Sequence, residues 1–168
     1  MAAIAPTVAD AIENAGGWLF DQALAGWDVT VITEESADCR PLQILGVRDH
    51  TLDSALSHRA DGTCLSAIAV SAAVLARDER VRRMVLAALE TGLAELRIWG
   101  DAEVAGADFG GTGPDGAASP VAHRLSSAAR AFKAQALAAA AVCGKSSADT
   151  EVFRRGARRG GLGLASAF

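Results

Sequence analysis

Residues 64–100, CLSAIAVSAAVLARDERVRRMVLAALETGLAELRIWG, decide the fold class. The first half of this stretch is apolar on nearly every side, which is typical of a buried helix. From Asp78 to Thr91 the apolar residues recur at helical spacing, and the polar break at Arg77 predicts a second helix with Asp78 as its N-cap. Residues 94–100, AELRIWG, have the composition of a strand. The stretch therefore indicates an α/β or α+β chain.

Two further strands are expected upstream, WDVTVIT at residues 27–33 and LQILGV at residues 42–47. The connector between them is too short for a parallel crossover, so this pair should be antiparallel or splayed. The strand at 42–47 and the strand at 94–100, with helix between them, resemble a βαβ unit and should be parallel. Residues 7–26 predict a helix that Thr7 caps, and Gly16-Gly17 marks close packing or a break in its middle.

A long Gly/Asp-rich loop at 101–119 precedes the last predicted helix, which starts at Ser119 and Pro120 and ends before Gly144. The expected fold is thus α/β (or α+β) with the order α-β-β-α-β-α, a small mixed three-stranded sheet packed with Ala-rich helices. Residues 1–144 are expected to form a single globular domain. Residues 145–168 are basic and Gly-rich and are expected to be a mobile tail.

The composition of the 168 residues excludes several classes of protein. The formal net charge is −4, which argues against nucleic-acid binding by the whole domain. No apolar run reaches the roughly 18 residues of a membrane span, and the N-terminus lacks the basic region of a signal peptide. Three widely spaced cysteines without a CxxC pair indicate free thiols and a cytoplasmic location.

The polar stretch RDHTLDSALSHRADGTCLS, residues 48–66, raises the question of a catalytic site. If Thr51 caps a short helix, His50 and His58 lie about 12 Å apart along its axis, too far to share a metal ion, and we expect no metal site. Cys64 falls at the third position of a helix that Asp61 would cap, where a thiol pKa can be lowered, and His58 could serve as its base. The alternative is a connector in which Cys64 is a small buried hydrophobe.

Two other segments are candidate binding regions. The glycine-rich loop at 106–116 contains Gly110, Gly111, Thr112 and Gly113, whose backbone N–H groups could approach an anion, although it lacks the spacing of phosphate-binding loops. The tail presents a local positive patch that could contact a partner, made of Arg154, Arg155, Arg158 and Arg159. The competing interpretation of the glycine-rich segment is a flexible surface loop, and that of the basic segment is a solvated, disordered tail.

No Ser-His-Asp order, HExxH, Walker loop or zinc ribbon is present, and no cofactor is expected. The leading hypothesis is a non-catalytic cytoplasmic interaction or regulatory protein that acts as a homodimer or larger homo-oligomer. The first alternative is a small-ligand-binding protein or thiol-dependent enzyme, with a site between residues 50–64 and the 106–116 loop. The second alternative is nucleic-acid binding through the basic tail, and no membrane partner is expected.

Overall fold

The structure is a computed structural model of the chain. It describes residues 1–34, 38–57, 66–90, 94–101, 109–110, 119–142 and 148–158. The elements, in chain order, are β1 (Ala2–Ala5), α1 (Val8–Leu24), β2 (Thr30–Thr33), α2 (Arg40–Ile44), β3 (Arg48–Thr51), α3 (Leu52–Ser57), β4 (Ala67–Ser71), α4 (Ala72–Arg77), α5 (Glu79–Glu90), β5 (Glu95–Trp99), β6 (Phe109–Gly110), β7 (Ser119–Arg124), α6 (Ser127–Ala139) and β8 (Thr150–Arg158).

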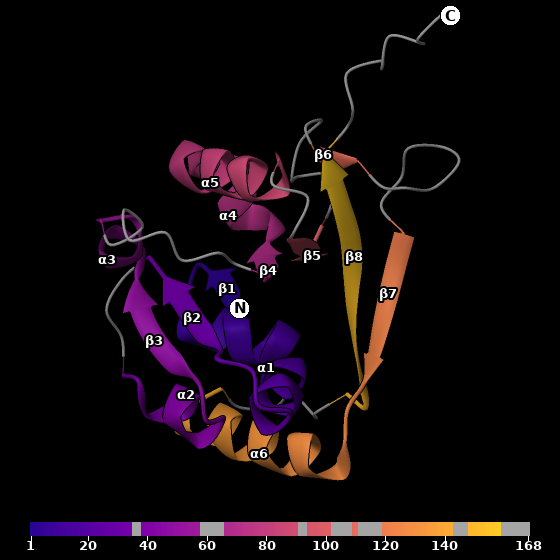
Figure 1. The fold of residues 1–168 in the computed structure, drawn as a ribbon. Coiled ribbons are helices and arrows are strands. Elements are labelled where there is room, and N and C mark those ends of the chain that lie inside the picture. The colour runs from indigo at the N-terminus through magenta and orange to yellow at the C-terminus, as the bar shows by residue number, and fades with distance from the viewer. Residues whose placement is uncertain are drawn as a thin grey trace, which may run out of the picture.

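One eight-stranded sheet organises the chain (Figure 1). Its order is β3-β2-β1-β4-β5-β8-β6, and β7 pairs with β8. The five neighbouring strands β3, β2, β1, β4 and β5 are parallel to one another. The strand β8 runs antiparallel to β5, β6 and β7. The mixed α/β class is confirmed, but the expected three-stranded sheet is wrong. The parallel part has the strand order of a doubly wound α/β fold.

The helices cover both faces of the parallel strands. One core cluster joins α1, α2 and α6 to one face, and the other joins α3, α4 and α5 to the opposite face. The strands β1 and β4, AAIA and AIAVS, are almost completely buried between these layers. They were missed because short alanine-rich runs lack the alternation of a half-buried strand and resemble buried helix.

The region around residues 40–51 differs from its prediction. Residues 40–44 form α2, with Pro41 in its first turn, instead of a strand at 42–47. The strand is β3, an exposed edge strand made of polar residues that were expected in a connector. Since α2 provides the crossover, β2 and β3 are parallel, neither antiparallel nor splayed. The strand at 42–47 was also expected to be the parallel partner of β5. The parallel partner of β5 is instead β4, which lies where a helix was expected.

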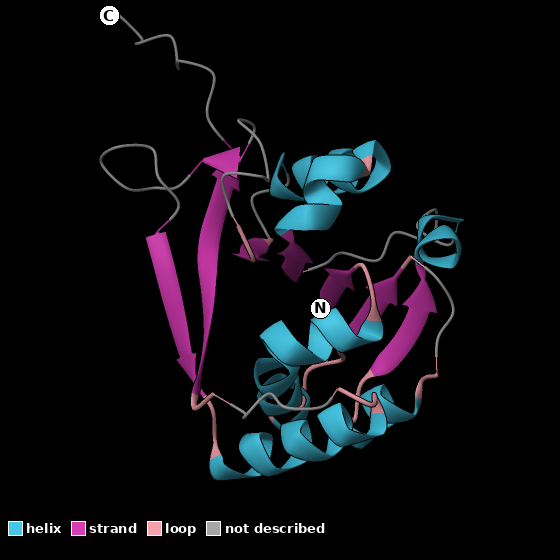
Figure 2. Cartoon of the chain, turned by 180° about the vertical axis from the view of Figure 1, so that it is seen from behind, coloured by secondary structure: helices cyan, strands magenta, loops and turns pink. Residues whose placement is uncertain are grey.

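The C-terminal prediction is also corrected. Ser119 and Pro120 begin the strand β7, whereas α6 begins later, with Ser126 as the N-cap that accepts from the Ala129 N–H at 3.0 Å. Residues 150–158, expected in a mobile tail, form β8. Figure 2 shows the antiparallel pair β7 and β8, which α6 connects, standing to one side of the helices, with α6 crossing below α1. The sheet therefore continues well past residue 144.

None of the helices in the described parts of the chain has both the length and the apolar character to span a membrane.

Candidate functional site

A pocket of about 220 Å³ lies at the carboxyl ends of β1, β4 and β5. Ligands of open α/β sheets bind beyond this end of the strands. The elements that follow each strand contribute the lining, which consists of Asp10, Asn14, Ser71, Ala72, Ala73, Trp99, Gly100 and Asp101. We call these residues the strand-end pocket.

Local sequence explains how the first turn of α1 reaches this pocket. Thr7 caps the helix, because its side chain accepts from the Asp10 N–H at 3.1 Å. Asp10 therefore stands in the first turn, where the free N–H groups of a helix favour a negative charge. On the opposite wall, Gly100 has a φ of +85°, which allows the chain to turn sharply as β5 ends.

Hydrogen bonds hold the Asp10 carboxylate on both of its oxygens. The indole Nε1–H of Trp99 donates to Oδ2 at 2.9 Å, and the amide of Asn14 donates to Oδ1 at 3.1 Å. The same amide nitrogen donates to the Asp10 carbonyl oxygen at 2.9 Å. Trp99 is 2% exposed, so it is a rigid support. An oriented carboxylate at the edge of a pocket is the arrangement that a general base requires.

A second and larger hollow, of about 410 Å³, lies between α3 and α5. Its lining consists of Leu56, Arg80, Arg83, Met84 and Ala87. Arg80 already pairs with Asp53 at 2.8 Å and with Asp78 at 2.9 Å. This lining offers neither a carboxylate nor a nucleophile, so the smaller strand-end pocket is the better candidate.

Few of the residues predicted from sequence come together. His50 lies exposed on β3, at the outer edge of the sheet. Its proposed neighbours His58 and Cys64 lie outside the described residues. Gly110 pairs with Ala157 in the short strand β6, whereas Gly111, Thr112 and Gly113 lie outside the described residues.

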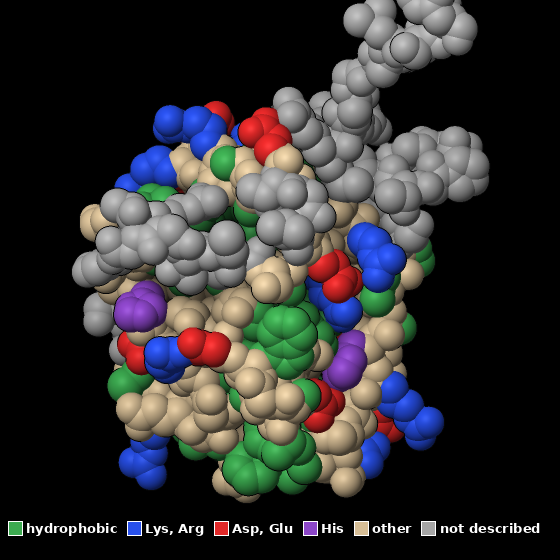
Figure 3. Space-filling view, in the orientation of Figure 1, with side chains coloured by type: hydrophobic (Ala, Val, Ile, Leu, Met, Phe, Trp, Pro, Cys, Tyr) green, Lys and Arg blue, Asp and Glu red, His purple; other side chains and the backbone are tan. Residues whose placement is uncertain are grey.

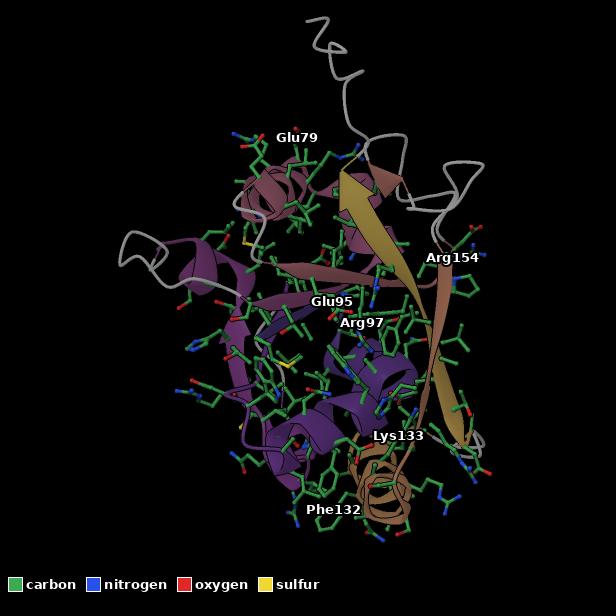
Figure 4. All side chains as sticks on the ribbon, turned by 45° about the vertical axis from the view of Figure 1, so that its right-hand side comes forward. Glu79, Glu95, Arg97, Phe132, Lys133 and Arg154 are labelled. Carbon is green, nitrogen blue, oxygen red and sulfur yellow. The ribbon has the colours of Figure 1, made fainter. Side chains whose placement is uncertain are left out.

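Three arginines of the predicted partner patch, Arg154, Arg155 and Arg158, belong to β8 instead of a tail. Arg154 is exposed and labelled on the outer side of the paired strands β7 and β8 in Figure 4. Arg155 donates to Glu95 at 3.3 Å, and Arg158 pairs with Phe109 in the sheet. Arg159 lies outside the described residues. Contact between these arginines and a partner stays a prediction.

Asp21, His123 and Ser126 form a cluster that contains the residue types of a hydrolytic triad. His123 Nε2 and the Ser126 hydroxyl both bond to the Asp21 carboxylate, at 2.8 and 2.6 Å. In a triad the histidine stands between the serine and the acid, but here the carboxylate is in the middle. The Ser126 oxygen also caps α6. The cluster is therefore a structural connection between α1 and α6.

The comparisons with known proteins follow the fold. No protein-family model matches the chain, and no curated protein matches its sequence. A deacetylase of teicoplanin biosynthesis, solved with teicoplanin, is similar in structure with a TM-score of 0.62 and 14% identity over 95% of this chain and 99% of that one. The A40926 pseudoaglycone deacetylase has a TM-score of 0.61 and 15% identity over 95% and 98% of the two chains. These likenesses establish a shared fold along nearly the whole chain.

The comparisons overturn our leading hypothesis. The similar solved structures described above are deacetylases, and this finding overturns the expectation of a non-catalytic interaction or regulatory protein. It rested on the lack of a catalytic motif, and that reasoning overlooked the strand-end pocket. Asp10 was not singled out because the strand that precedes it was not recognised.

A teicoplanin deacetylase of this fold was solved in a zinc-inhibited form, with a TM-score of 0.61 and 15% identity over 94% of this chain and 97% of that one. Zinc sites in enzymes use three protein ligands chosen from His, Cys, Asp and Glu. Across the parts of the chain that the structure describes, no three such side chains come close enough to hold a metal ion. The strand-end pocket itself offers two aspartates and no histidine or cysteine. The described residues do not fit a zinc centre.

Proposed function

We propose that this chain is a hydrolase that removes a short acyl group from an amine, and that the reaction takes place in the strand-end pocket. The observation that carries the proposal is the Asp10 carboxylate, held by Trp99 and Asn14 at the carboxyl end of the sheet. The deacetylase structures of the same fold support the reaction class.

Asp10 would act as the general base. It takes a proton from a water molecule while the water oxygen bonds to the carbonyl carbon of the substrate. The carbon–nitrogen bond then breaks, and the proton passes from Asp10 to the departing nitrogen. The products are a carboxylic acid and a free amine, so the atoms balance with water as the only second reactant.

The size of the pocket limits the part of a substrate that it can enclose. A volume of about 220 Å³ corresponds to roughly seven water molecules at the volume each has in the liquid. This is room for an acetamido group and an adjoining ring, and it is smaller than the usual pocket for a drug-sized ligand. We therefore expect a short acyl group on a polar amine as the group that enters.

The experiment is an assay of acetate release from a panel of N-acetylated amino sugars and amino acids with the purified chain. Asp10→Asn keeps the shape of the side chain but removes the base, so turnover should fall on the order of a hundredfold or more. Trp99→Phe removes one support of the carboxylate and should give a smaller loss of turnover.

Asp28→Asn is the matched control. Asp28 is an exposed aspartate that pairs with Arg48. It lies just before the amino end of β2, whereas the pocket lies at the carboxyl ends of the parallel strands. Its turnover should equal that of the wild-type chain. Equal turnover in Asp10→Asn and wild type, or no release from any compound in the panel, would contradict the proposed function.

A further inference from the structure

A buried ion pair is joined to the backbone in the middle of α1. Lys133 on α6 and Glu151 on β8 lie 2.6 Å apart, and their side chains are 3% and 2% exposed. The Glu151 carboxylate accepts from the Gly17 and Trp18 N–H groups, each at 2.8 Å. The Lys133 ammonium donates to the Glu13 carbonyl oxygen at 2.7 Å. Figure 4 shows Lys133 on the side of α6 that faces α1.

The backbone groups that the pair occupies are those of one helical hydrogen bond. In an uninterrupted α-helix the N–H of residue 17 donates to the carbonyl of residue 13. Here the carbonyl of Glu13 receives the ammonium and the N–H of Gly17 donates to the carboxylate. The ion pair is thus bonded to both groups of one turn in the middle of α1, and it ties this turn to α6 and β8.

Stability alone does not account for this arrangement. Two charges lose their hydration when they are buried, and their attraction often fails to compensate. An apolar contact between α1, α6 and β8 would fill the same space without burying any charge. The pair therefore acts on geometry, because its hydrogen bonds fix the middle of α1 against α6 and β8.

The first half of α1 carries the carboxylate of the strand-end pocket. Asn14, which holds Asp10, directly follows Glu13, whose carbonyl oxygen receives the ammonium. Trp99, the other support of Asp10, stands on β5, outside the helix. The bond between Asp10 and Trp99 consequently depends on where the first half of α1 points.

We propose that Lys133 and Glu151 are positioning residues for the strand-end pocket, because they hold α1 in the course that brings Asp10 to Trp99. The functional part of this inference rests on the proposed function. Its structural part concerns the wild-type chain without any ligand and can be tested separately.

The test replaces both charges at once, in the variant with Lys133→Met and Glu151→Leu. With both side chains gone, the N–H of Gly17 and the carbonyl of Glu13 have each other as helical partners and no buried charge is left, so the variant should fold. The indole N–H of Trp99, followed by nitrogen–proton NMR and assigned with Trp99→Phe, should shift upfield as its bond to Asp10 is lost. The indole N–H of Trp18, which has no partner among the described residues, provides the unbonded reference. Turnover should fall on the order of a hundredfold, as for a misplaced catalytic group.

The matched control is the variant with Arg130→Met and Asp149→Leu. It removes an exposed ion pair, 2.9 Å long, between α6 and the residue next to β8. The Trp99 signal and the turnover should both stay at their wild-type values. A folded double variant at Lys133 and Glu151 with an unchanged Trp99 signal would overturn the proposal.

Two measurements keep the proposal testable if the double variant does not fold. Glu151→Gln retains the side-chain volume and one oxygen acceptor, and it should move the Trp99 signal in the same direction by less. In the wild-type chain, native-state hydrogen exchange should open the Gly17 and Trp18 amides and the Trp99 indole N–H together. Independent opening of these groups would overturn the inference. Failure of the acetate assay in wild type would reject the proposed function while these NMR measurements still decide the positioning role.

Discussion

Leu125 packs against the backbone of α1 at Gly17, where the absence of a side chain leaves it room. A Cβ atom at position 17 would lie 1.3 Å from Leu125 Cδ2 and 2.7 Å from its Cγ. Because Leu125 is 4% exposed, it has little space to withdraw. We expect Gly17→Ala to lower the free energy of unfolding by about 3 kcal/mol or more, measured by urea denaturation.

Gly16→Ala is the matched control for this prediction. Its Cβ would lie 3.2 Å from Ile12 Cγ2 and 3.6 Å from Leu45 Cδ1, which small shifts can relieve. Alanine is also favoured over glycine within a helix by about 1 kcal/mol. The free energy of unfolding should therefore change by less than about 1 kcal/mol in either direction. Equal losses at positions 16 and 17 would contradict the close approach of Leu125.

Asp21 provides a prediction about pH. Burial raises the pKa of this carboxyl group, but the hydrogen bonds from Ser126 and His123 outweigh it and leave the pKa below its ordinary value. Such a group stabilises the fold above its unfolded pKa of about 3.9, and the stabilisation is lost as the pH falls through the lower folded value. Asp21→Asn should therefore be less stable than wild type at neutral pH, and the difference should shrink below about pH 4. Urea denaturation at a series of pH values measures this, and a difference that is constant with pH would count against it.

Among the elements, α5 depends on a cap that the sequence already indicated. The Asp78 carboxylate accepts from the backbone N–H groups of Arg80 and Val81, at 2.8 and 3.3 Å. We expect Asp78→Ala to cost about 1 kcal/mol of unfolding free energy, as measured by thermal or urea denaturation. Asp53→Ala also removes a partner of Arg80 but caps no part of α5, so its cost should stay within about 0.5 kcal/mol.

The elements with strong local signals were predicted well. The cap at Thr7, the break before Asp78 and the strand at 95–99 all lie close to where the sequence placed them. Residues 40–44, where part of a strand was expected, form the helix α2. The other errors fall on strands: the alanine-rich β1 and β4, the polar edge strand β3, and the C-terminal β7 and β8. Their strand conformation comes from pairing with neighbours that are distant in sequence, which a local pattern does not record.

The candidate site was missed for the same reason. Asp10 gains its position only once β1 is known to lie between β2 and β4. The one available signal was the order of a short apolar run, the cap residue Thr7 and an acidic residue three positions later. The partners of Asp10 include Trp99 on β5, and no spacing in the sequence connects these two residues.

At the scale of the whole molecule, β8 lies between β5 and the strands β6 and β7. Its Phe153 is fully buried, and its Glu151 neutralises Lys133. We expect a chain that ends at residue 144 to lose cooperative unfolding, since it would leave a buried ammonium without its charged partner. A chain that ends at residue 158 should unfold cooperatively, as followed by circular dichroism. Cooperative unfolding of the shorter chain would show that β8 is dispensable.

We also expect the chain to assemble as a homodimer or larger homo-oligomer. Apolar side chains gather at the lower edge of the face in Figure 3, over α6. Phe132 is 44% exposed and stacks on Phe20, with ring centroids 4.6 Å apart, and Leu24, one turn further along α1, is 68% exposed. Native mass spectrometry should give a multiple of the 17.2 kDa chain mass, and Phe132→Ser should shift it toward one copy. A single-copy mass for the wild-type chain would contradict the expectation.

The ion pair that bonds to the backbone of α1 also has a consequence for synthesis on the ribosome. The helix emerges early, but the carboxylate that accepts from its Gly17 amide is translated 134 residues later. Until then the nascent α1 has only its own carbonyl groups and water as acceptors, and nothing fixes its position against β8. Contacts between such distant parts of a chain also form slowly. The helix made first is thus completed last, and the pocket at its start takes shape only after residue 151 has left the ribosome.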